Sequence, residues 1–408
     1  MVAVIGLGHV GLVLAVCLAE LGYHVIGVDF PSVIELVNTG TPPFFEPQLS
    51  DMLSYHIRKQ NLQATTRMED VSNTRLIWIT VGTTLLADGS LDIDNVERIV
   101  RQLENLCSKD VVIAIKSTMP VGACRFIAGT LSKDGPHLVY NPEFLREGTA
   151  IYDFFNPGKI VVGADYAQDF EFLAAIYISL GCTPIHTSWE NAELIKLSHN
   201  ALNALHISFF NELALATDDM DVSLHVVSQA LRIDQATLSQ YLQPGFSYGG
   251  SCLPYTVRYL EHLAESRGYA APLLHAVAVV NENRIHHLVN KLSKAIGGLA
   301  GQSIALWGMA YKAPTDDLRN SPSVRLAQQL LVAGAEVWTF DPFVEVDRLM
   351  EFGCKVCHTL EESLNYASAL VVLTRCSIFA SVPASTIFNA IPRERVFDIV
   401  GALPQLGR

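Results

Sequence analysis

The chain contains 408 residues, enough for roughly two or three domains of ordinary size, each with a hydrophobic core of its own. Half of the residues are hydrophobic and only 17% are charged, which excludes an intrinsically disordered protein. The formal net charge is −13 and there is no long basic run, so neither nucleic acid nor an anionic membrane surface is an expected partner.

The first stretch of the chain, Met1 to Ala19, contains no Asp, Glu, Lys or Arg and could be mistaken for a membrane span or a signal segment. Three glycines interrupt it, at a spacing that has a better explanation below. The eight cysteines are scattered and do not fit a disulfide framework. We therefore expect a cytoplasmic protein.

The chain opens with the pattern of a strand, a glycine turn and a helix. Val2–Ile5 is an apolar run typical of a buried parallel strand, and the apolar-periodic helix after the turn ends near Gly22. In a dinucleotide-binding βαβ unit, glycines at this spacing form the tight turn, admit the pyrophosphate at the helix N-terminus and let helix and strand pack closely. The cofactor-binding residues predicted here are Gly6, Gly8, His9, Val10 and Gly11.

The second predicted strand, Val25–Asp29, ends in an acid. A carboxylate at this point accepts hydrogen bonds from the ribose 2′-hydroxyl and repels a 2′-phosphate, so we expect NAD rather than NADP. Further buried strands are predicted at Leu76–Thr80 and Val111–Ile115, each followed by a polar loop. This alternation indicates an open parallel sheet, with cofactor and substrate meeting at the carboxyl ends of its strands.

A weaker copy of the pattern lies near the end of the chain. It comprises a strand and turn at Ser303–Gly308, a helix at Pro322–Ala333 and a strand at Val337–Asp341. Its turn keeps only one of the three glycines, Gly308, so a second dinucleotide is not expected there. Between the two halves, the pattern is mostly helical. The expected fold class is thus α/β, with two Rossmann-like doubly wound parallel-sheet domains at residues 1–189 and 298–408 joined by a central helical region at 190–297, where a subunit interface is expected.

Residues suited to chemistry lie in the middle of the chain. Glu193, Lys196 and Asn200 fall on one face of a predicted helix, although such a stripe is more often solvated. Cys252 follows a Gly-Gly-Ser turn; most lone cysteines are inert, but one in such a turn is placed to meet a ligand. Glu143 follows an apolar strand in a segment that could also be a surface loop. No HExxH pattern or paired CxxC indicates a metal site.

Taken together, these segments resemble the UDP-glucose and GDP-mannose 6-dehydrogenase family over essentially the whole chain. Besides the glycine turn, the matching motifs are Ser117-Thr118-x-Pro120-x-Gly122, Asn141 to Glu147, Glu193 to Asn200, Gly249 to Cys252, and Gly308 to Pro322 with Lys312 and Arg319. Two details are similar to the GDP-mannose branch: Leu238-Ser239-Gln240-Tyr241 before Pro244-Gly245-Phe246, and the closing strand Val396 to Gly401.

The resemblance implies a four-electron oxidation of the sugar 6-hydroxyl to a carboxylate, with two NAD used in turn. Cys252 would attack the intermediate aldehyde, and water would hydrolyse the resulting thioester. Lys196 and Asn200 would hold the developing oxyanion, while Thr118 and Glu143 would line the site and position water. The resemblance also implies a homodimer, a role in polysaccharide biosynthesis, and GDP-mannose as first choice of substrate with UDP-glucose second.

Further binding residues follow from the same resemblance. Those expected to contact the cofactor, besides the glycine turn and Asp29, are Thr83, Thr118 and Arg319. Those expected to contact the nucleotide-sugar are Phe144, Leu145, Arg146, Glu147, Lys196, Asn200, Tyr241, Phe246, Tyr248, Gly249 and Lys312. Lys312 could equally be an ordinary surface residue.

One departure from the family pattern bears on the reaction. After Cys-x-Pro the family has Lys-Asp, whose aspartate acts in proton transfer, but this chain has Tyr255-Thr256. Loss of a positioned acid or base typically costs about 10²- to 10⁴-fold in rate. The alternatives to a complete dehydrogenase are therefore a paralogue that performs one oxidation or takes an unusual sugar, and a catalytically silent ligand-binding protein.

Overall fold

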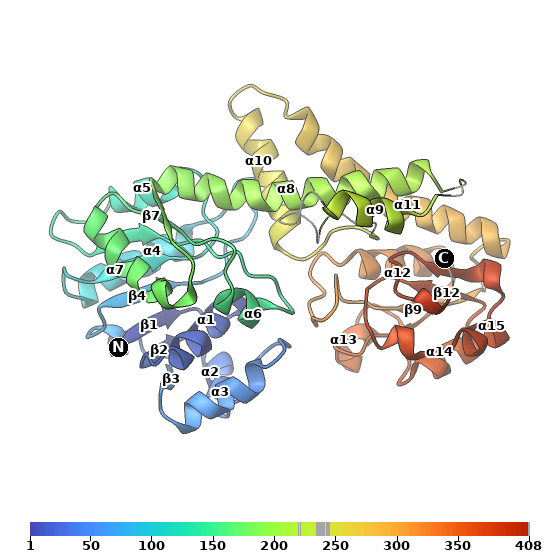
Figure 1. Ribbon diagram of the computed structural model, residues 1–408, viewed down its shortest axis with the longest axis horizontal. Coiled ribbons are helices and arrows are strands. Elements are labelled where there is room, and N and C mark those ends of the chain that lie inside the picture. The colour runs from blue at the N-terminus through green and yellow to red at the C-terminus, as the bar shows by residue number, and fades with distance from the viewer. Residues whose placement is uncertain (219, 221, 234–240, 242–244, 407–408) are drawn as a thin grey trace. The chain divides into compact units, whose positions relative to one another are not determined.

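The computed structural model describes residues 1–218, 220, 222–233, 241 and 245–406. The chain forms two compact units, Met1–His199 and Asn200–Arg408, which are described here one at a time (Figure 1). No helix among these residues is long and apolar enough to cross a membrane.

An eight-stranded sheet forms the centre of the first unit, in the order β3-β2-β1-β4-β5-β6-β7-β8. The strands are β1 Val2–Ile5, β2 Val25–Val28, β3 Leu62–Thr65, β4 Leu76–Ile79, β5 Val112–Ile115, β6 His137–Tyr140, β7 Val161–Gly163 and β8 Ile185–Thr187. The predicted parallel sheet is confirmed, with one antiparallel step between β6 and β7 that the sequence did not indicate. Because of this step, the segment between β6 and β7 starts and ends at the same edge of the sheet, where the carboxyl ends of β1, β4 and β5 also lie.

Both faces of this sheet are covered by helices, as the uninterrupted apolar strands predict. Along β1, Val2 and Val4 pack into one core cluster while Ala3 and Ile5 pack into another. The helices of the unit are α1 His9–Glu20, α2 Pro31–Asn38, α3 Leu49–Arg58, α4 Asp94–Leu106, α5 Ala123–Ala128, α6 Ala150–Phe155 and α7 Ala167–Tyr177. All residues of α1 from Gly11 to Ala19 are buried, which explains the uncharged start of the chain by core packing.

The central part of the chain is helical in the residues that the structure describes. Helix α8 runs over Trp189–Ala216 and is followed by α9 Leu224–Ile233, α10 Cys252–Glu265 and α11 Pro272–Ile296. This agrees with the helical region expected between the two α/β parts.

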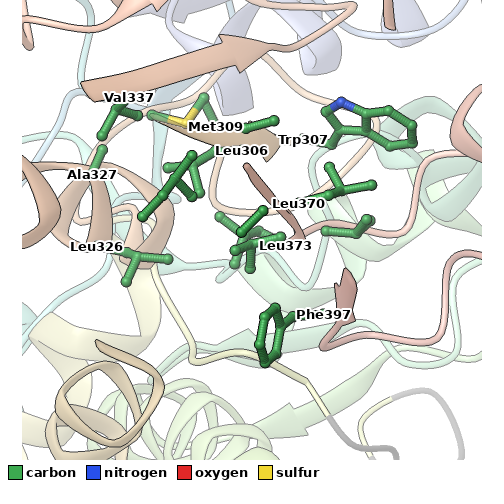
Figure 2. Close-up of a cluster of buried hydrophobic side chains, with 14 of the residues drawn as sticks. Leu306, Trp307, Met309, Leu326, Ala327, Val337, Leu370, Leu373 and Phe397 are labelled. Atoms are coloured by element: carbon green, nitrogen blue, oxygen red, sulfur yellow. The ribbon is translucent and has the colours of Figure 1, made fainter. Parts of the chain in front are cut away.

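The second unit contains a five-stranded parallel sheet in the order β11-β10-β9-β12-β13. Its strands are β9 Ser303–Trp307, β10 Glu336–Phe340, β11 Lys355–Val356, β12 Ala369–Val372 and β13 Val396–Asp398, and its helices are α12 Pro322–Val332, α13 Val346–Met350, α14 Leu360–Tyr366 and α15 Ala384–Ala390. Figure 2 shows its core, in which side chains of β9, β12 and α12 pack together, among them Leu306, Leu370 and Leu326. The indole of Trp307 donates a 2.8 Å hydrogen bond to Ser363, so the core's largest side chain is also satisfied as a donor.

Candidate active site

The glycine turn lies where the strand order reverses, between β1 and β4, which is the ligand-binding position of open α/β sheets. The hydroxyl of Thr80, at the end of β4, donates a 2.6 Å hydrogen bond to the carbonyl of Gly6. A Cβ at Gly11 would lie 1.7 Å from that carbonyl oxygen, so only glycine fits there. Gly6 has φ +93°, a conformation that glycine adopts without strain.

The same turn fits a dinucleotide. A Cβ at Gly8 would meet nothing within 4 Å, which leaves room for a ligand beside the start of α1. The first amides of a helix have no partner within it and favour an anionic group such as a pyrophosphate. Asp29, at the end of β2, accepts hydrogen bonds from the backbone amides of Leu7 (2.5 Å) and Phe30 (2.6 Å), so its carboxylate faces the turn.

Two predicted cofactor residues on neighbouring loops are in contact. The hydroxyl of Thr83 donates a 3.0 Å hydrogen bond to the carbonyl of Thr118. Next to it, the Ser117 hydroxyl donates to the carbonyl of Val81 at 2.7 Å. The loops after β4 and β5 are therefore joined beside the glycine turn.

Glu143 and Lys196 form a buried ion pair in the first unit. The Lys196 ammonium donates a 2.7 Å hydrogen bond to Glu143, and the two side chains are only 4% and 8% exposed. Burial alone would raise the pKa of Glu143, but the Lys196 charge and the amide of Leu145 lower it below its ordinary value. The alternative of a surface loop at Glu143 is wrong, because the segment from β6 turns back along the sheet edge and buries this carboxylate.

A second buried lysine lies behind this pair and was missed by the sequence analysis. Lys116, at the end of β5, donates to the side-chain oxygen of Asn141 at 3.0 Å, and the Tyr177 hydroxyl donates to the same oxygen at 2.7 Å. Burial lowers the pKa of Lys116 to about 7, with the Lys196 charge acting in the same direction and Glu143 opposing it. The only sequence signal for it is a lysine at the end of an apolar strand.

The predicted helical face of Glu193, Lys196 and Asn200 is present on α8, but the alternative of a solvated stripe is wrong because all three are buried. Glu193 accepts hydrogen bonds from the amides of Gly122 (2.6 Å) and Cys124 (2.8 Å). Burial raises the pKa of Glu193, and these two amides partly offset that effect. Glu193 thus anchors the start of α5 and the loop that carries Thr118.

The rest of the segment after β6 is held by internal contacts. Arg146 pairs through its side chain with Asp153 on α6, and its backbone amide donates to the same carboxylate at 3.0 Å. The amide of Leu145 donates to Glu143 at 2.7 Å. The ring of Phe144 lies with its centroid 5.6 Å from the Lys196 nitrogen. Glu147 is partly exposed.

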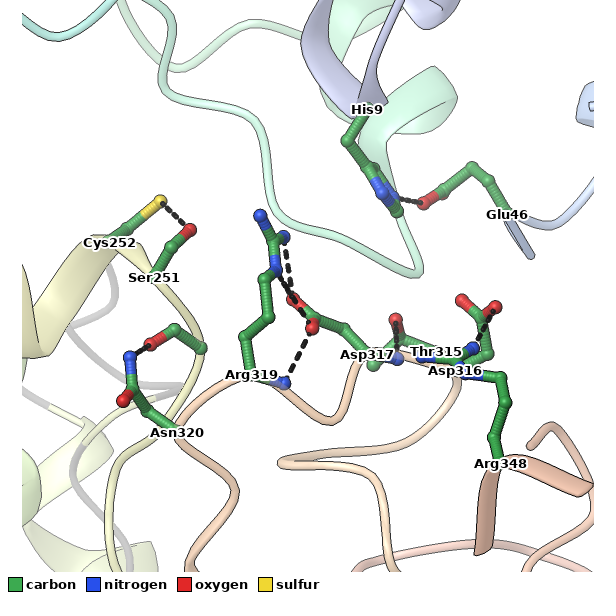
Figure 3. Close-up of polar contacts among 11 residues, drawn as sticks. His9, Glu46, Ser251, Cys252, Thr315, Asp316, Asp317, Arg319, Asn320 and Arg348 are labelled. Carbon is green, nitrogen blue, oxygen red and sulfur yellow. Dashed lines mark hydrogen bonds and ion pairs between the residues drawn. The ribbon is translucent and has the colours of Figure 1, made fainter. Parts of the chain in front are cut away.

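Cys252 lies in the second unit as the first residue of α10, with its side chain exposed. The N-terminal turn of a helix favours negative charge. The preceding turn is fixed by its neighbours: the amide of Gly250 donates to the carbonyl of Arg319 at 2.9 Å, and the Asn320 side chain donates to the carbonyl of Gly250 at 3.0 Å (Figure 3). A Cβ at Gly249 would lie 2.6 Å from the Asn320 carbonyl oxygen.

The structure therefore brings together two motifs that lie far apart in the second half of the chain. Within the later motif, Arg319 pairs with Asp317 (Figure 3), and Lys312 lies over the ring of Tyr311 at 5.6 Å. Lys312 is half-buried, so the alternative of an ordinary surface lysine is not decided by its burial.

The position that departs from the family pattern is buried. Thr256 is 2% exposed, and its hydroxyl accepts a 3.1 Å hydrogen bond from the side chain of Asn200. Tyr255 beside it is half-buried. The acceptor of the Asn200 hydrogen bond at this position is therefore a neutral hydroxyl and not a carboxylate.

The remaining predicted substrate residues, Tyr241, Phe246 and Tyr248, lie in the second unit. Phe246 packs into the core of the second unit, and Tyr248 is fixed by Asn281, whose side-chain oxygen accepts from the Tyr248 amide at 2.7 Å. Tyr241 is half-buried. The stretch Leu238 to Gln240 and Pro244, which were compared with the GDP-mannose branch, lie outside the described residues.

No cluster of three or more His, Cys, Asp or Glu side chains that could hold a metal occurs in the described part of the chain. The switch-point position of the glycine turn, the space at Gly8 and the carboxylate of Asp29 are those of an NAD-binding α/β domain. Models of the UDP-glucose/GDP-mannose dehydrogenase family match three parts of the chain: the NAD-binding domain at residues 1–180, the central domain at 190–283 and the UDP-binding domain at 305–405. The chain belongs to this family of nucleotide-sugar dehydrogenases.

Individual relatives match over nearly their whole length. UDP-glucose 6-dehydrogenase YwqF of Bacillus subtilis is 30% identical over 97% of this chain and 92% of its own. The structure of a UDP-glucose dehydrogenase from Pyrobaculum islandicum superposes with a TM-score of 0.90 at 29% identity, covering 98% and 97% of the two chains. A GDP-mannose dehydrogenase from Pseudomonas aeruginosa gives a TM-score of 0.55 at 29% identity, covering 99% and 97%. The comparisons do not support the expected similarity to the GDP-mannose branch.

Proposed function

We propose that the protein oxidises the 6-hydroxyl of UDP-glucose to a carboxylate, with residues 1–189 binding NAD, residues 298–408 binding the nucleotide and residues 190–297 forming a homodimer interface. The support for UDP-glucose is the match to the UDP-binding domain and to UDP-glucose dehydrogenases. The sequence motifs alone made GDP-mannose the first choice of substrate; it is now the second candidate. The observation that carries the proposal is the exposed Cys252 at the start of α10. It follows a glycine turn that is held by a hydrogen bond from the side chain of Asn320 to the carbonyl of Gly250.

The chain's own residues have the following tasks. The glycine turn and Asp29 would hold NAD, which when bound would supply the hydride acceptor for carbon 6 in both oxidations. In each oxidation the hydroxyl proton leaves to a base. The Cys252 thiolate adds to the aldehyde carbon, forming a carbon–sulfur bond, and the oxygen takes up a proton. Loss of the second hydride and of that proton leaves a thioester. Water then adds at the same carbon, the carbon–sulfur bond breaks, and the carboxylate and the thiol are released, with one proton lost to a base or to solvent.

Lys196 and Asn200 stabilise the charge that develops on the oxygen, since a buried ammonium and an amide are preorganised donors. Glu143, ionised and paired with Lys196, positions the water and is the acid/base candidate in place of the missing aspartate. Thr118 lines the site on the cofactor side. In the second unit, Lys312 contacts the nucleotide-sugar, and Arg319 contacts the cofactor.

A specific observation favours a second candidate function. Because Thr256 offers Asn200 only a neutral hydroxyl, a protein-bound proton acceptor is absent from this position, and the reaction could end at the aldehyde. This alternative predicts one NADH per sugar, whereas the complete reaction predicts two.

The test is NADH release from UDP-glucose and GDP-mannose, with the product identified by mass. Two NADH per UDP-glucuronate support the proposal, and one NADH with a trapped aldehyde supports the single oxidation. NAD binding without turnover would indicate a silent ligand-binding protein. Cys252→Ala should abolish formation of the uronate, whereas Cys182→Ala, at a half-buried cysteine elsewhere, should leave it unchanged.

A further inference from the structure

A buried carboxylate in the first unit connects the glycine turn with the segment after β6. Glu46, in the loop before α3, has a side chain that is only 1% exposed. One of its oxygens lies 3.1 Å from the Nε2 of His9 and also accepts a 2.7 Å hydrogen bond from the amide of Gly148. The other oxygen accepts a 2.8 Å hydrogen bond from the amide of Ala150.

The histidine at one end of this connection, His9, belongs to the glycine turn. His9 is the first residue of α1, and its ring stacks on Phe44 with centroids 4.0 Å apart. Figure 3 shows its imidazole directed at Glu46. A pyrophosphate would bind at the first turn of α1, so a change in charge or order at this turn would act directly on the imidazole.

The segment at the other end depends on Glu46 for its shape. Gly148 has φ +84°, a conformation that glycine adopts without strain, and it lies two residues before the start of α6. Its amide and that of Ala150 are held by Glu46. Asp153 on α6 in turn pairs with Arg146. The two amide contacts to Glu46 and this pair together fix residues 146–150.

We propose that Glu46 is a positioning residue that couples the binding of NAD at the glycine turn to the order of residues 146–150. His9 and Gly148 share one carboxylate oxygen, so holding His9 still when NAD binds also holds the acceptor of the Gly148 amide. This role does not depend on which sugar is oxidised, and it can be tested with NAD alone, without turnover.

The experiment is amide hydrogen exchange, followed by peptide mass, on the full chain with and without saturating NAD. In the wild type, NAD should slow exchange both at residues 6–11 and in a peptide containing Gly148 and Ala150, the latter by about fivefold or more, the lower end of coupling between sites. The decisive variant is His9→Phe, which keeps the stacked ring but has no nitrogen to meet Glu46. His9 is itself a predicted cofactor residue, so the NAD concentration is raised until titration shows the variant to be saturated. NAD should then slow exchange at residues 6–11 in this variant and leave the Gly148 peptide unchanged.

A direct contact of NAD with residues 146–150 would preserve the effect on the Gly148 peptide in His9→Phe and would overturn the proposal. The proposal would also be overturned if NAD slowed exchange in the wild type only at residues 6–11. As an independent measurement, Glu46→Gln should weaken NAD binding by about tenfold in the wild-type background and by less than about twofold in His9→Phe, because contacting residues are not additive. Equal effects in both backgrounds would show that Glu46 has only a general structural role.

Discussion

The side-chain amide of Asn200 donates a 3.1 Å hydrogen bond to the hydroxyl of Thr256, and both side chains are buried. The contact joins α8 to α10, the helix that begins with Cys252. It fixes the orientation of an amide that we place beside the reacting oxygen.

Replacing Thr256 by valine keeps its shape and removes the hydroxyl. We expect the free energy of unfolding to fall by about 1–3 kcal/mol, because a buried amide loses its acceptor. Turnover should fall as well, since Asn200 is no longer held in one orientation. Thr256→Ser retains the hydroxyl and should stay near wild type in both measurements; a Val variant as stable and active as the Ser variant would show that the contact has no role.

The glycine turn offers a matched pair of substitutions. Gly8→Ala should leave the melting temperature nearly unchanged, because its Cβ meets nothing within 4 Å, yet it should weaken NAD binding by filling the ligand's space. Gly11→Ala should destabilise the protein strongly, because its Cβ would lie 1.7 Å from the Gly6 oxygen. Calorimetry for stability and titration with NAD for affinity separate the two effects. The prediction fails if Gly8→Ala binds NAD as the wild type does.

The ion pair of Lys196 and Glu143 predicts a double-mutant result. Lys196→Met alone leaves a buried carboxylate without its partner and should cost about 3–5 kcal/mol of stability. Adding Glu143→Gln removes that charge, so the double variant should be more stable than Lys196→Met. Urea unfolding of the wild type, both single variants and the double variant measures this coupling, and additive losses would contradict it.

Lys116 predicts a dependence of stability on pH. Its pKa in the folded protein is about 7, against 10.5 for a free side chain, so between these values the unfolded chain binds more protons. The free energy of unfolding therefore gains up to about 1.4 kcal/mol per pH unit from this group as the pH rises through the window, and nothing below it. Lys116→Met should lose this gain, so its urea midpoint should fall progressively behind the wild type from pH 7 to pH 9. Lys109→Met, at an exposed lysine, is the control and should show a constant difference.

The local patterns of the sequence predict the elements well. The apolar run Val2–Ile5, the glycine spacing and the acid at position 29 define a strand, a turn and a second strand by themselves, because each depends only on near neighbours in the chain. The same holds for β9, α12 and β10 in the second unit. Helical spacing and the Gly-Gly-Ser turn single out Lys196 and Cys252 as candidates, and the resemblance to the family adds the roles expected of them.

The polar contacts that shape the site could not be predicted in this way. Glu46 and Glu193 accept hydrogen bonds from amides that lie about 70 to 100 residues away, and an isolated acid in a sequence does not indicate which distant backbone it will meet. The antiparallel direction of β7 could not be predicted for the same reason, because it depends on residues distant in the sequence. Its three residues carry little pattern of their own, and their direction is set by the sheet edge they meet.

The position of β1 has a consequence for how the chain is made. Strand β1 precedes β2 and β4 in the chain and lies between them in the sheet, paired with β2 on one side and with β4 on the other. Until Leu76–Ile79 has emerged, one edge of β1 is without a neighbour while its apolar faces already need cover. The growing chain therefore passes through a stage with an open strand edge, the kind of surface on which nascent α/β proteins aggregate or are held by chaperones.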